Sequence, residues 1–417
     1  MRPSGIILLL ALAACAQAPR TETFRPADTG ELTRLHERYR VPAIARREFT
    51  HAQLWSALGP VVDAAGGPER DEVGRSAEGR PIYRIRYGGG PTRVLLWSQM
   101  HGNESTATMA LADLFRFLAE APDDPRARRL AQRLSIEAVP MLNPDGAERF
   151  QRRNALSIDI NRDARALATP EARILRGMQQ RFRPDFGFNL HDQDVRARVG
   201  SSDRLAAIAL LAPPYNQARD DNAVRMRAKR VAAIVRAAAE PLVAGHVTRY
   251  DDTFNPRAFG DLMQSWGTST VLIESGGWRN DPEKQHLRRV NFVALLTALD
   301  AIAMGAYAAA DPAPYETLPQ NGSPVNDLLV RGPVIVAPGL EPYRADVMVQ
   351  FADPLALRAP RVVEVGDLSN AAARDTVEAA GLFLHPAAPL AVDRPASFVL
   401  RRGRDAASEA VWRMDGN

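Results

Sequence analysis

The sequence is poor in cysteine and lysine: among its 417 residues, cysteine occurs once, as Cys15, and lysine twice, as Lys229 and Lys284. A single cysteine excludes a disulfide framework within the chain and a metal site built from several thiolates. Arginine therefore carries nearly all of the positive charge, and it is spread between acidic residues without a run of like charge. This pattern, with a formal net charge of +4, indicates a solvated surface and predicts no nucleic-acid partner.

The N-terminal apolar run, residues 5–13, is too short to cross a membrane as a mature helix. It is typical of a secretory signal, and the sequence Leu-Ala-Ala-Cys that ends at Cys15 resembles the bacterial lipobox. We therefore expect residues 1–15 to be a lipoprotein signal peptide, with Cys15 lipidated and the protein facing the periplasm. By resemblance to envelope sorting rules, Ala16 in place of Asp favours the outer membrane. Cleavage near Ala16 or Ala18, which would leave a soluble periplasmic protein, is the alternative.

Beyond a tether at residues 16–30, short apolar runs alternate with helical patterns as far as residue 310. The apolar runs lie at residues 94–97, 135–142, 185–190, 206–211 and 269–273. This alternation predicts an α/β fold with a mixed, mostly parallel central sheet and helices on both faces. The histidines His36 and His51, near the start of this region, are expected at the surface.

Asp311-Pro312-Ala313-Pro314 reads as a linker, and short strand-like runs follow it. We therefore expect a catalytic domain over residues 31–310 and a small β-rich accessory domain over residues 311–417. The accessory region carries no cluster of residues typical of catalysis, and its one histidine, His385, is expected to be structural.

His101, His191 and Glu274 share one feature: each stands at the end of an apolar, strand-like run. Glu104 lies three residues after His101 and opens a helical pattern. Because the carboxyl ends of strands in an open α/β sheet meet at one crevice, these residues can converge there. Two histidines and a glutamate form a zinc site that leaves a position open for water, and Glu274 can act as general base for that water.

Several motifs join these residues in a fixed order between about residues 74 and 307. They are GRSAEGRPI, HGNE, NPDG, RRN followed by DINRD, NLH and VLIESGG. The ordered set resembles the zinc carboxypeptidase family, the carboxypeptidase A-like metallopeptidases. The resemblance implies a carboxypeptidase-like fold, a Zn²⁺ cofactor and a peptide substrate with a free C-terminal carboxylate.

The resemblance also implies a role for individual residues. His101, Glu104 and His191 match the zinc ligands, and Glu274 matches the general base. Arg152 matches the arginine that stabilises the oxyanion, with Arg149 and Arg153 as rivals in the same cluster. The remaining matches are Asn161 and Arg162, which would hold the substrate's terminal carboxylate, and Asp159, which would orient a ligand histidine.

The sequence departs from the family in two places. The spacing from Glu104 to His191 is shorter than in the digestive enzymes, which predicts trimmed loops around the cleft. The tyrosine that caps the substrate in the family should fall some twenty residues before the base. Tyr250 is the nearest candidate, but the stretch after it does not align, so the side-chain preference is unreadable from the sequence.

Three functions are compatible with these features. The leading one is a zinc metallocarboxypeptidase of the cell envelope, with peptidoglycan stem peptides as one candidate substrate. A zinc deacylase of N-acyl amino acids, similar to the desuccinylases, is the alternative, although Asn161-Arg162 beside NPDG favours the peptidase. A non-catalytic binding lipoprotein ranks lowest, since it predicts loss of a ligand or of the base, and all four residues are present.

Overall fold

The computed structural model describes residues 28–64 and 66–416. The predicted signal peptide, the lipidation site Cys15 and most of the tether therefore lie outside the described residues. Within the described part, no helix combines the length and apolar character needed to span a bilayer.

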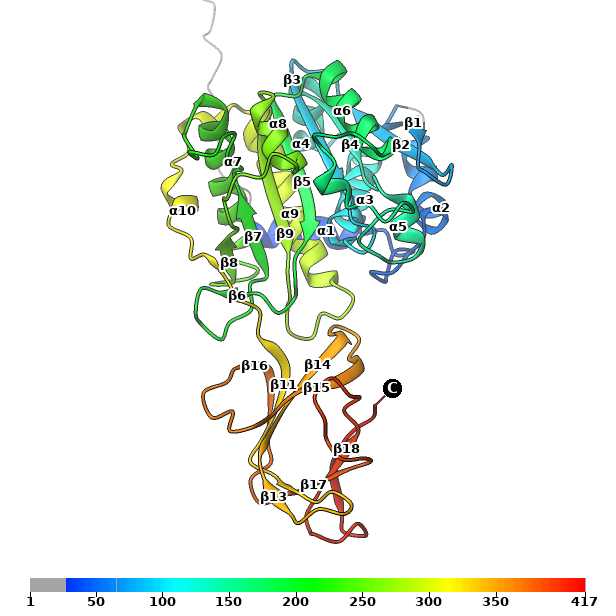
Figure 1. Cartoon of the computed structure of the whole chain (residues 1–417). Coiled ribbons are helices and arrows are strands. Elements are labelled where there is room, and N and C mark those ends of the chain that lie inside the picture. Colours follow the sequence, from blue (N-terminus) through cyan, green and yellow to red (C-terminus); the bar gives the residue numbers. More distant parts are fainter. Residues whose placement is uncertain (1–27, 65, 417) are drawn as a thin grey trace, which may run out of the picture.

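The larger part of the structure is built on an eight-stranded mixed sheet with the order β1-β2-β4-β3-β5-β9-β7-β8 (Figure 1). Its strands are β1 (Glu69–Arg75), β2 (Pro81–Tyr87), β3 (Thr92–Ser98), β4 (Leu134–Val139), β5 (Phe186–Asp192), β7 (Ile208–Leu211), β8 (Val247–Arg249) and β9 (Ser269–Ser275). The central strands β4, β3, β5 and β9 are parallel neighbours. Their carboxyl ends therefore meet at one edge of the sheet, as the sequence predicted.

Helices cover both faces of this sheet, which confirms the predicted α/β architecture. They are α1 (Thr29–Tyr39), α2 (His51–Val62), α3 (Thr106–Glu120), α4 (Pro125–Arg133), α5 (Pro144–Glu148), α6 (Pro170–Phe182), α7 (Ala223–Ala239), α8 (Phe259–Ser265) and α9 (Gln285–Ala303). Strand β3 explains why the central strands read as unbroken apolar runs. Val94 and Leu96 pack into the core that includes α3, α7 and α9, whereas Leu95 and Trp97 pack into the core with α6 and α8.

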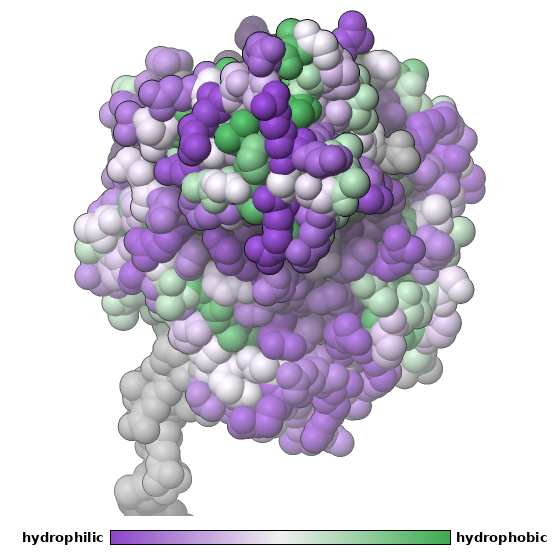
Figure 2. All heavy atoms as spheres, turned by 90° about the horizontal axis from the view of Figure 1, so that it is seen from below, coloured by the Kyte–Doolittle hydropathy of each residue, from purple (hydrophilic) through white to green (hydrophobic). Residues whose placement is uncertain are grey.

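The C-terminal part forms two smaller sheets with their own core (Figure 1, orange to red). One has the order β15-β14-β11-β16 and the other β13-β12-β17-β18-β19. Their strands are β11 (Asn326–Arg331), β12 (Val334–Ile335), β13 (Tyr343–Arg344), β14 (Asp346–Asp353), β15 (Arg358–Gly366), β16 (Ala373–Glu378), β17 (Phe383–Pro386), β18 (Phe398–Arg401) and β19 (Ala410–Met414). Seen from this end, the surface is mainly hydrophilic, with small hydrophobic patches between (Figure 2).

The segment that joins the two parts packs against the larger one. It contains α10 (Ala313–Glu316) and β10 (Asn321–Gly322), and β10 pairs with β6 (Arg198–Val199). Tyr315 and Leu318 lie in the main hydrophobic core, and the Tyr315 hydroxyl accepts a hydrogen bond from the backbone N–H of Ala212 at 2.9 Å. This segment is therefore anchored along its length.

The expected surface position of the two early histidines is wrong. His36 is 1% exposed, and its Nε2 lies 3.1 Å from Oδ2 of Asp113, which also forms a buried ion pair with Arg288. Burial lowers the pKa of His36. His51 is half-buried and donates from Nε2 to the carbonyl oxygen of Pro81 at 2.9 Å. Both histidines lie on helices, and their partners are remote in sequence, so the local sequence pattern did not indicate that they are buried.

Candidate metal centre

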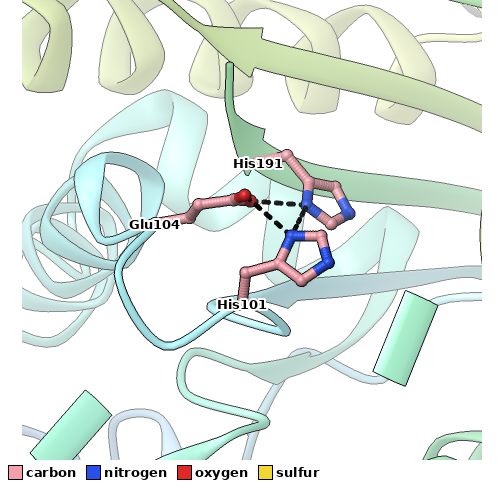
Figure 3. A group of neighbouring side chains, drawn as sticks. All are labelled: His101, Glu104 and His191. Atoms are coloured by element: carbon pink, nitrogen blue, oxygen red, sulfur yellow. Dashed lines mark hydrogen bonds and ion pairs between the residues drawn. The ribbon is translucent and has the colours of Figure 1, made fainter. Parts of the chain in front are cut away.

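His101, Glu104 and His191 converge at the carboxyl edge of the central sheet (Figure 3). His101 lies in the turn after β3, Glu104 lies just before α3, and His191 lies near the end of β5. Nδ1 of His101 is 2.7 Å from Oε1 of Glu104, and Nδ1 of His191 is 2.7 Å from Oε2. The three donor atoms lie within 4.8 Å of one another and are buried. Two imidazole nitrogens and a carboxylate at this spacing fit a catalytic zinc ion.

A close approach of the His101 turn to α5 positions His101. A Cβ atom on Gly102 would lie 2.0 Å from the backbone carbonyl carbon of Gly146, in α5. Asn143 caps this helix, because its Oδ1 accepts from the N–H of Gly146, and its Nδ2 donates to the carbonyl of Met100. Only a residue without a side chain fits at position 102, which explains the glycine between His101 and Asn103.

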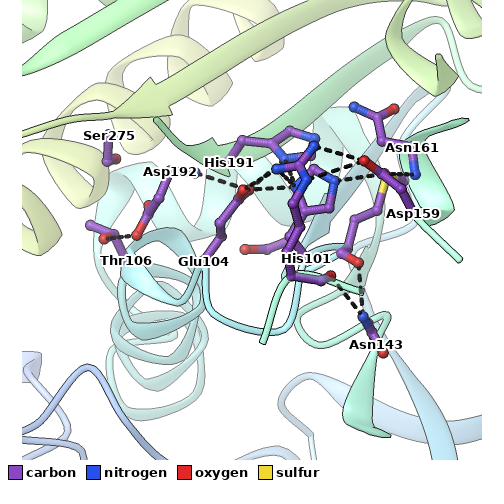
Figure 4. Close-up of polar contacts among 12 residues, drawn as sticks. His101, Glu104, Thr106, Asn143, Asp159, Asn161, His191, Asp192 and Ser275 are labelled. Carbon is purple, nitrogen blue, oxygen red and sulfur yellow. Dashed lines mark hydrogen bonds and ion pairs between the residues drawn. The ribbon is translucent and has the colours of Figure 1, made fainter. Parts of the chain in front are cut away.

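Asp159 fixes the orientation of His101 (Figure 4). Its Oδ1 lies 2.9 Å from Nε2 of His101, so Nε2 is hydrogen-bonded to Asp159 and Nδ1 faces Glu104 and His191. Its Oδ2 accepts two hydrogen bonds from Arg152, at 3.1 Å from Nε and 2.9 Å from Nη2. Nη1 of Arg152 in turn lies 3.0 Å from Oε1 of Glu104. One carboxylate thus aligns both a histidine of the cluster and an arginine beside it.

The charges of the cluster perturb one another. Burial would lower the pKa of His101, but the carboxylates of Glu104 and Asp159 raise it to about 9. Burial would raise the pKa of Glu104, but the two histidines hold it below its usual range. For His191, burial prevails and lowers the pKa. Glu104 therefore stays ionised, while His101 tends to hold a proton and His191 tends to be neutral. A metal ion that binds here would bind the ionised carboxylate and displace the proton of His101.

Glu274 lies on β9 directly opposite His191 in the register of the parallel pair β5–β9. Its side chain lines the cavity above the cluster and forms no hydrogen bond with the described residues. Burial and the nearby charge of Glu104 raise the pKa of Glu274 to about 8. A buried, unpaired carboxyl group with a raised pKa is suited to exchange protons near neutral pH.

A cavity of about 530 Å³ opens over these residues. Besides His101, Glu104 and Glu274, its lining includes Asn161, Arg162 and Tyr250. Oδ1 of Asn161 accepts from the N–H of Phe259 at 2.9 Å, so the amide nitrogen is left as a donor. Arg162 is exposed, and no carboxylate of the described residues lies within ion-pair distance of it. The cavity therefore contains the cluster and, among the described residues, a guanidinium group without an acidic partner.

The structure separates the three arginines that the sequence left as rivals. Arg152 lines the cavity and contacts the cluster. Arg149 instead forms an ion pair with Glu78, with 2.5 Å between Nη2 and Oε1. Arg153 donates to the carbonyl of Ser157 at 3.0 Å. Of the three, only Arg152 can reach a substrate bound at the cluster.

Other cavity residues had no signal in the sequence. Asp261, near the start of α8, is 7% exposed, and its Oδ1 accepts from the N–H of Asn255 at 2.9 Å. Burial raises its pKa to about 6. Gln320 and Asn321 also line the cavity, although they come from the segment after residue 310. Tyr250, which the sequence offered without an alignment, lies in the cavity, where the charge of Glu274 and burial raise its pKa to about 12.

Comparison with known proteins also indicates a metallocarboxypeptidase. Residues 69–189 match the model of the zinc carboxypeptidase family. Carboxypeptidase 2 of Trichophyton tonsurans is 30% identical over 152 residues, which cover 35% of this chain and 28% of that protein. Carboxypeptidase D of Mus musculus is 33% identical over 133 residues, which cover 25% of this chain and 10% of that protein. The chain thus spans less than a third of the length of these relatives.

Two solved structures share the fold. A structure described as a carboxypeptidase from Burkholderia mallei has a TM-score of 0.50 at 19% identity, over 62% of this chain and 68% of that one. Thrombin activatable fibrinolysis inhibitor has a TM-score of 0.50 at 14% identity, over 67% of this chain and 80% of that one. The family match ends just before His191, and the fold brings His191 to the two ligands inside the match. Residues 69–189 therefore match a zinc carboxypeptidase domain, and the larger part of the structure has the fold of metallocarboxypeptidases.

Proposed function

We propose that this protein is a zinc metallocarboxypeptidase of the bacterial cell envelope that removes C-terminal residues from peptides. One observation carries the proposal. A single cavity contains a zinc donor set, the unpaired carboxyl group of Glu274 and the unpaired guanidinium group of Arg162. A carboxypeptidase needs all three, because it must recognise a chain end, polarise the last peptide bond and move a proton.

Arg162 and Asn161 would bind the terminal carboxylate of the substrate. A guanidinium group can donate two parallel hydrogen bonds to a carboxylate, and the free amide nitrogen of Asn161 can add a third. Because both residues share one cavity with the cluster, a C-terminus bound to them would leave the last peptide bond near the cluster. Binding at the chain end therefore sets which bond is cleaved.

A zinc ion held by His101, Glu104 and His191 would act as a Lewis acid toward the scissile carbonyl and lower the pKa of the attacking water. Glu274 takes a proton from that water and delivers it to the leaving amine. Arg152, aligned by Asp159, donates hydrogen bonds to the oxygen on which negative charge develops. Each of these groups is fixed by contacts of its own or by the sheet, so little reorganisation is needed.

The charge of the cavity favours a basic terminal residue. Its lining has six carboxyl groups, from Glu104, Asp192, Asp194, Asp251, Asp261 and Glu274, against two guanidinium groups, from Arg152 and Arg162. Glu274, with a pKa of about 8, is mostly protonated at pH 7, and Asp192 and Asp194 pair with Lys284 and Arg196. Besides Glu274, Asp251 and Asp261 are therefore the carboxyl groups of the lining that form no ion pair with the described residues. Asp261 is the natural contact for a cationic side chain, because its only hydrogen-bond donors among the described residues are backbone N–H groups.

The proposed envelope location rests on the sequence Leu-Ala-Ala-Cys that ends at Cys15, which predicts a lipid anchor. An enzyme anchored there would meet peptidoglycan stem peptides, which we propose as one class of natural substrate. Soluble peptides in the periplasm are the other class with the required free carboxylate.

The test is hydrolysis by the purified, zinc-loaded protein of three substrate groups: peptides with a free C-terminus, N-acyl amino acids and muropeptides. Release of C-terminal residues from the first or third group is the expected result. Activity confined to the N-acyl amino acids would replace the peptidase by a deacylase. The absence of hydrolysis in all three groups would contradict the proposed function.

A further inference from the structure

A second cavity of about 270 Å³ adjoins the substrate cavity. Both cavities are lined by Glu104, Arg152, Asp192, Gln193 and Asp194, so they adjoin beside the metal cluster. One wall of the second cavity comes from the larger part and includes Arg47 and Phe150. The rest of the wall comes from Asp353, at the end of β14, and from Pro354 and Leu355 in the turn between β14 and β15. In Figure 1 this turn is the end of the orange hairpin that meets the larger part.

Ion pairs hold the turn in place. Nη2 of Arg47 lies 2.5 Å from Oδ2 of Asp353, and both side chains are mostly buried, at 13% and 23% exposure. Arg358 bridges Asp353 and Glu48, at 2.9 and 3.0 Å. Deeper in the interface, Arg196 pairs with the buried Asp327 at 2.7 Å and donates to the carbonyl of Phe351 at 2.6 Å. Charge-assisted hydrogen bonds of this kind are stronger than neutral ones and hold the two parts in a defined geometry.

The arrangement gives the substrate a direction. Asn161 and Arg162 line the first cavity and not the second. A peptide whose terminal carboxylate binds to them must pass the cluster with its last peptide bond. The residues before that bond then lie beside the cluster, where the second cavity adjoins the first.

Resting on the proposed function, we propose that the second cavity binds the substrate residues that precede the scissile bond, and that the β14–β15 turn selects apolar side chains there. The C-terminal sheets thereby become part of the substrate site.

The apolar surface of this cavity comes from Phe150, Val195, Pro354 and Leu355, and the turn supplies the last two. The other nine lining residues are polar or charged. The cations of the cavity already have partners: Arg47 pairs with Asp353, Lys284 with Asp192 at 3.1 Å and Arg152 with Asp159. Among the described residues, no unpaired cation therefore remains in this cavity for an acidic side chain.

Leu355 allows a direct test, because it is half-buried in the turn and lines the cavity. Leu357 is a matched control, since it lies on the same turn, is 59% exposed and lines neither cavity. The substrates are N-acetylated peptides with one terminal residue in common and with Phe or Gly at each of the two positions before the scissile bond. The zinc-loaded full chain is assayed as parent, Leu355→Ala and Leu357→Ala, after thermal unfolding has verified that all three are folded.

The parent should cleave a Phe-containing peptide with higher kcat/KM than the Gly peptide. Leu355→Ala should reduce this preference about tenfold, which corresponds to about 1.4 kcal/mol, while leaving the Gly peptide nearly unaffected. Leu357→Ala should keep the parental preference. Equal preference in parent and Leu355→Ala, or equal losses in both variants, would overturn the assignment of the second cavity while leaving the carboxypeptidase intact. If the parent cleaves neither peptide, the proposed function fails, and this proposal fails with it.

Discussion

Replacement of Arg162 by alanine tests whether the enzyme recognises a chain end. Among the described residues, Arg162 has no acidic partner, and its one hydrogen bond is to the carbonyl of Asn161 at 2.8 Å. Truncating one partner of a buried charge pair costs about 2 to 5 kcal/mol. Because Arg162 is exposed in the open cavity, the lower part of this range applies. A loss of roughly 2 to 3 kcal/mol corresponds to a decrease in kcat/KM of about 30- to 150-fold.

The assay compares a peptide acid with the same peptide amidated at its C-terminus. The parent should strongly prefer the acid, and Arg162→Ala should lose most of that preference, since the amide has no charge for Arg162 to bind. Arg153→Ala is the control, because Arg153 is an arginine of the same region that does not line the cavity. If the parent cleaves acid and amide equally well, or if Arg162→Ala slows both to the same extent, Arg162 does not bind the terminal carboxylate.

Four further outcomes are expected. His191→Ala should hold much less zinc than the parent by metal analysis, and Asp159→Asn should lose roughly 10- to 100-fold in zinc affinity; parental zinc content in His191→Ala would remove His191 from the ligand set. Glu274→Gln should retain zinc and fold but lose roughly 10²- to 10⁴-fold in kcat; parental kcat would exclude Glu274 as the base. The preference for a terminal Arg over a terminal Phe should fall as the pH drops from 7 to 5, because Asp261, with a pKa raised to about 6, loses its charge over this range. Asp261→Asn should abolish this pH dependence, and a pH-dependent preference in that variant would point to another group. Cys15→Ser should move the protein from the membrane to the soluble fraction of cells, whereas equal partition of both forms would exclude Cys15 as the anchor.

The catalytic sheet could be predicted from the sequence because its central strands are buried on both faces. Such strands appear as unbroken apolar runs, and the polar residues that end them stand out, as His191 and Glu274 do on β5 and β9. Parallel strands also place these ends at one edge of the sheet. The convergence of residues 87 positions apart, Glu104 and His191, therefore follows from local pattern and topology.

The cavity residues outside the strand ends could not be predicted in this way, because they do not belong to an apolar run or to a periodic pattern. Asp261 is an ordinary acid beside a short helix, and its role depends on burial in a cavity formed by remote segments. The choice among Arg149, Arg152 and Arg153 depended on the acceptor that each one meets: the carboxylates of Glu78 and Asp159 for the first two, and the carbonyl of Ser157 for the third. Long-range pairs of this kind become visible only once the chain is folded.

The predicted linker at residues 311–314 hides the contribution of the residues after it to the two cavities. The Pro-rich stretch at residues 311–314 looks like a separator, yet the chain after it returns to the substrate cavity with Gln320 and Asn321. Further on, Asp353 and Leu355 line the second cavity, which adjoins the metal cluster. Both cavities are thus lined in part by residues beyond the apparent linker. Because Arg47 and Arg196 hold the C-terminal sheets there through ion pairs, we expect a change in these sheets to alter substrate selection without touching the proposed ligands or the proposed base.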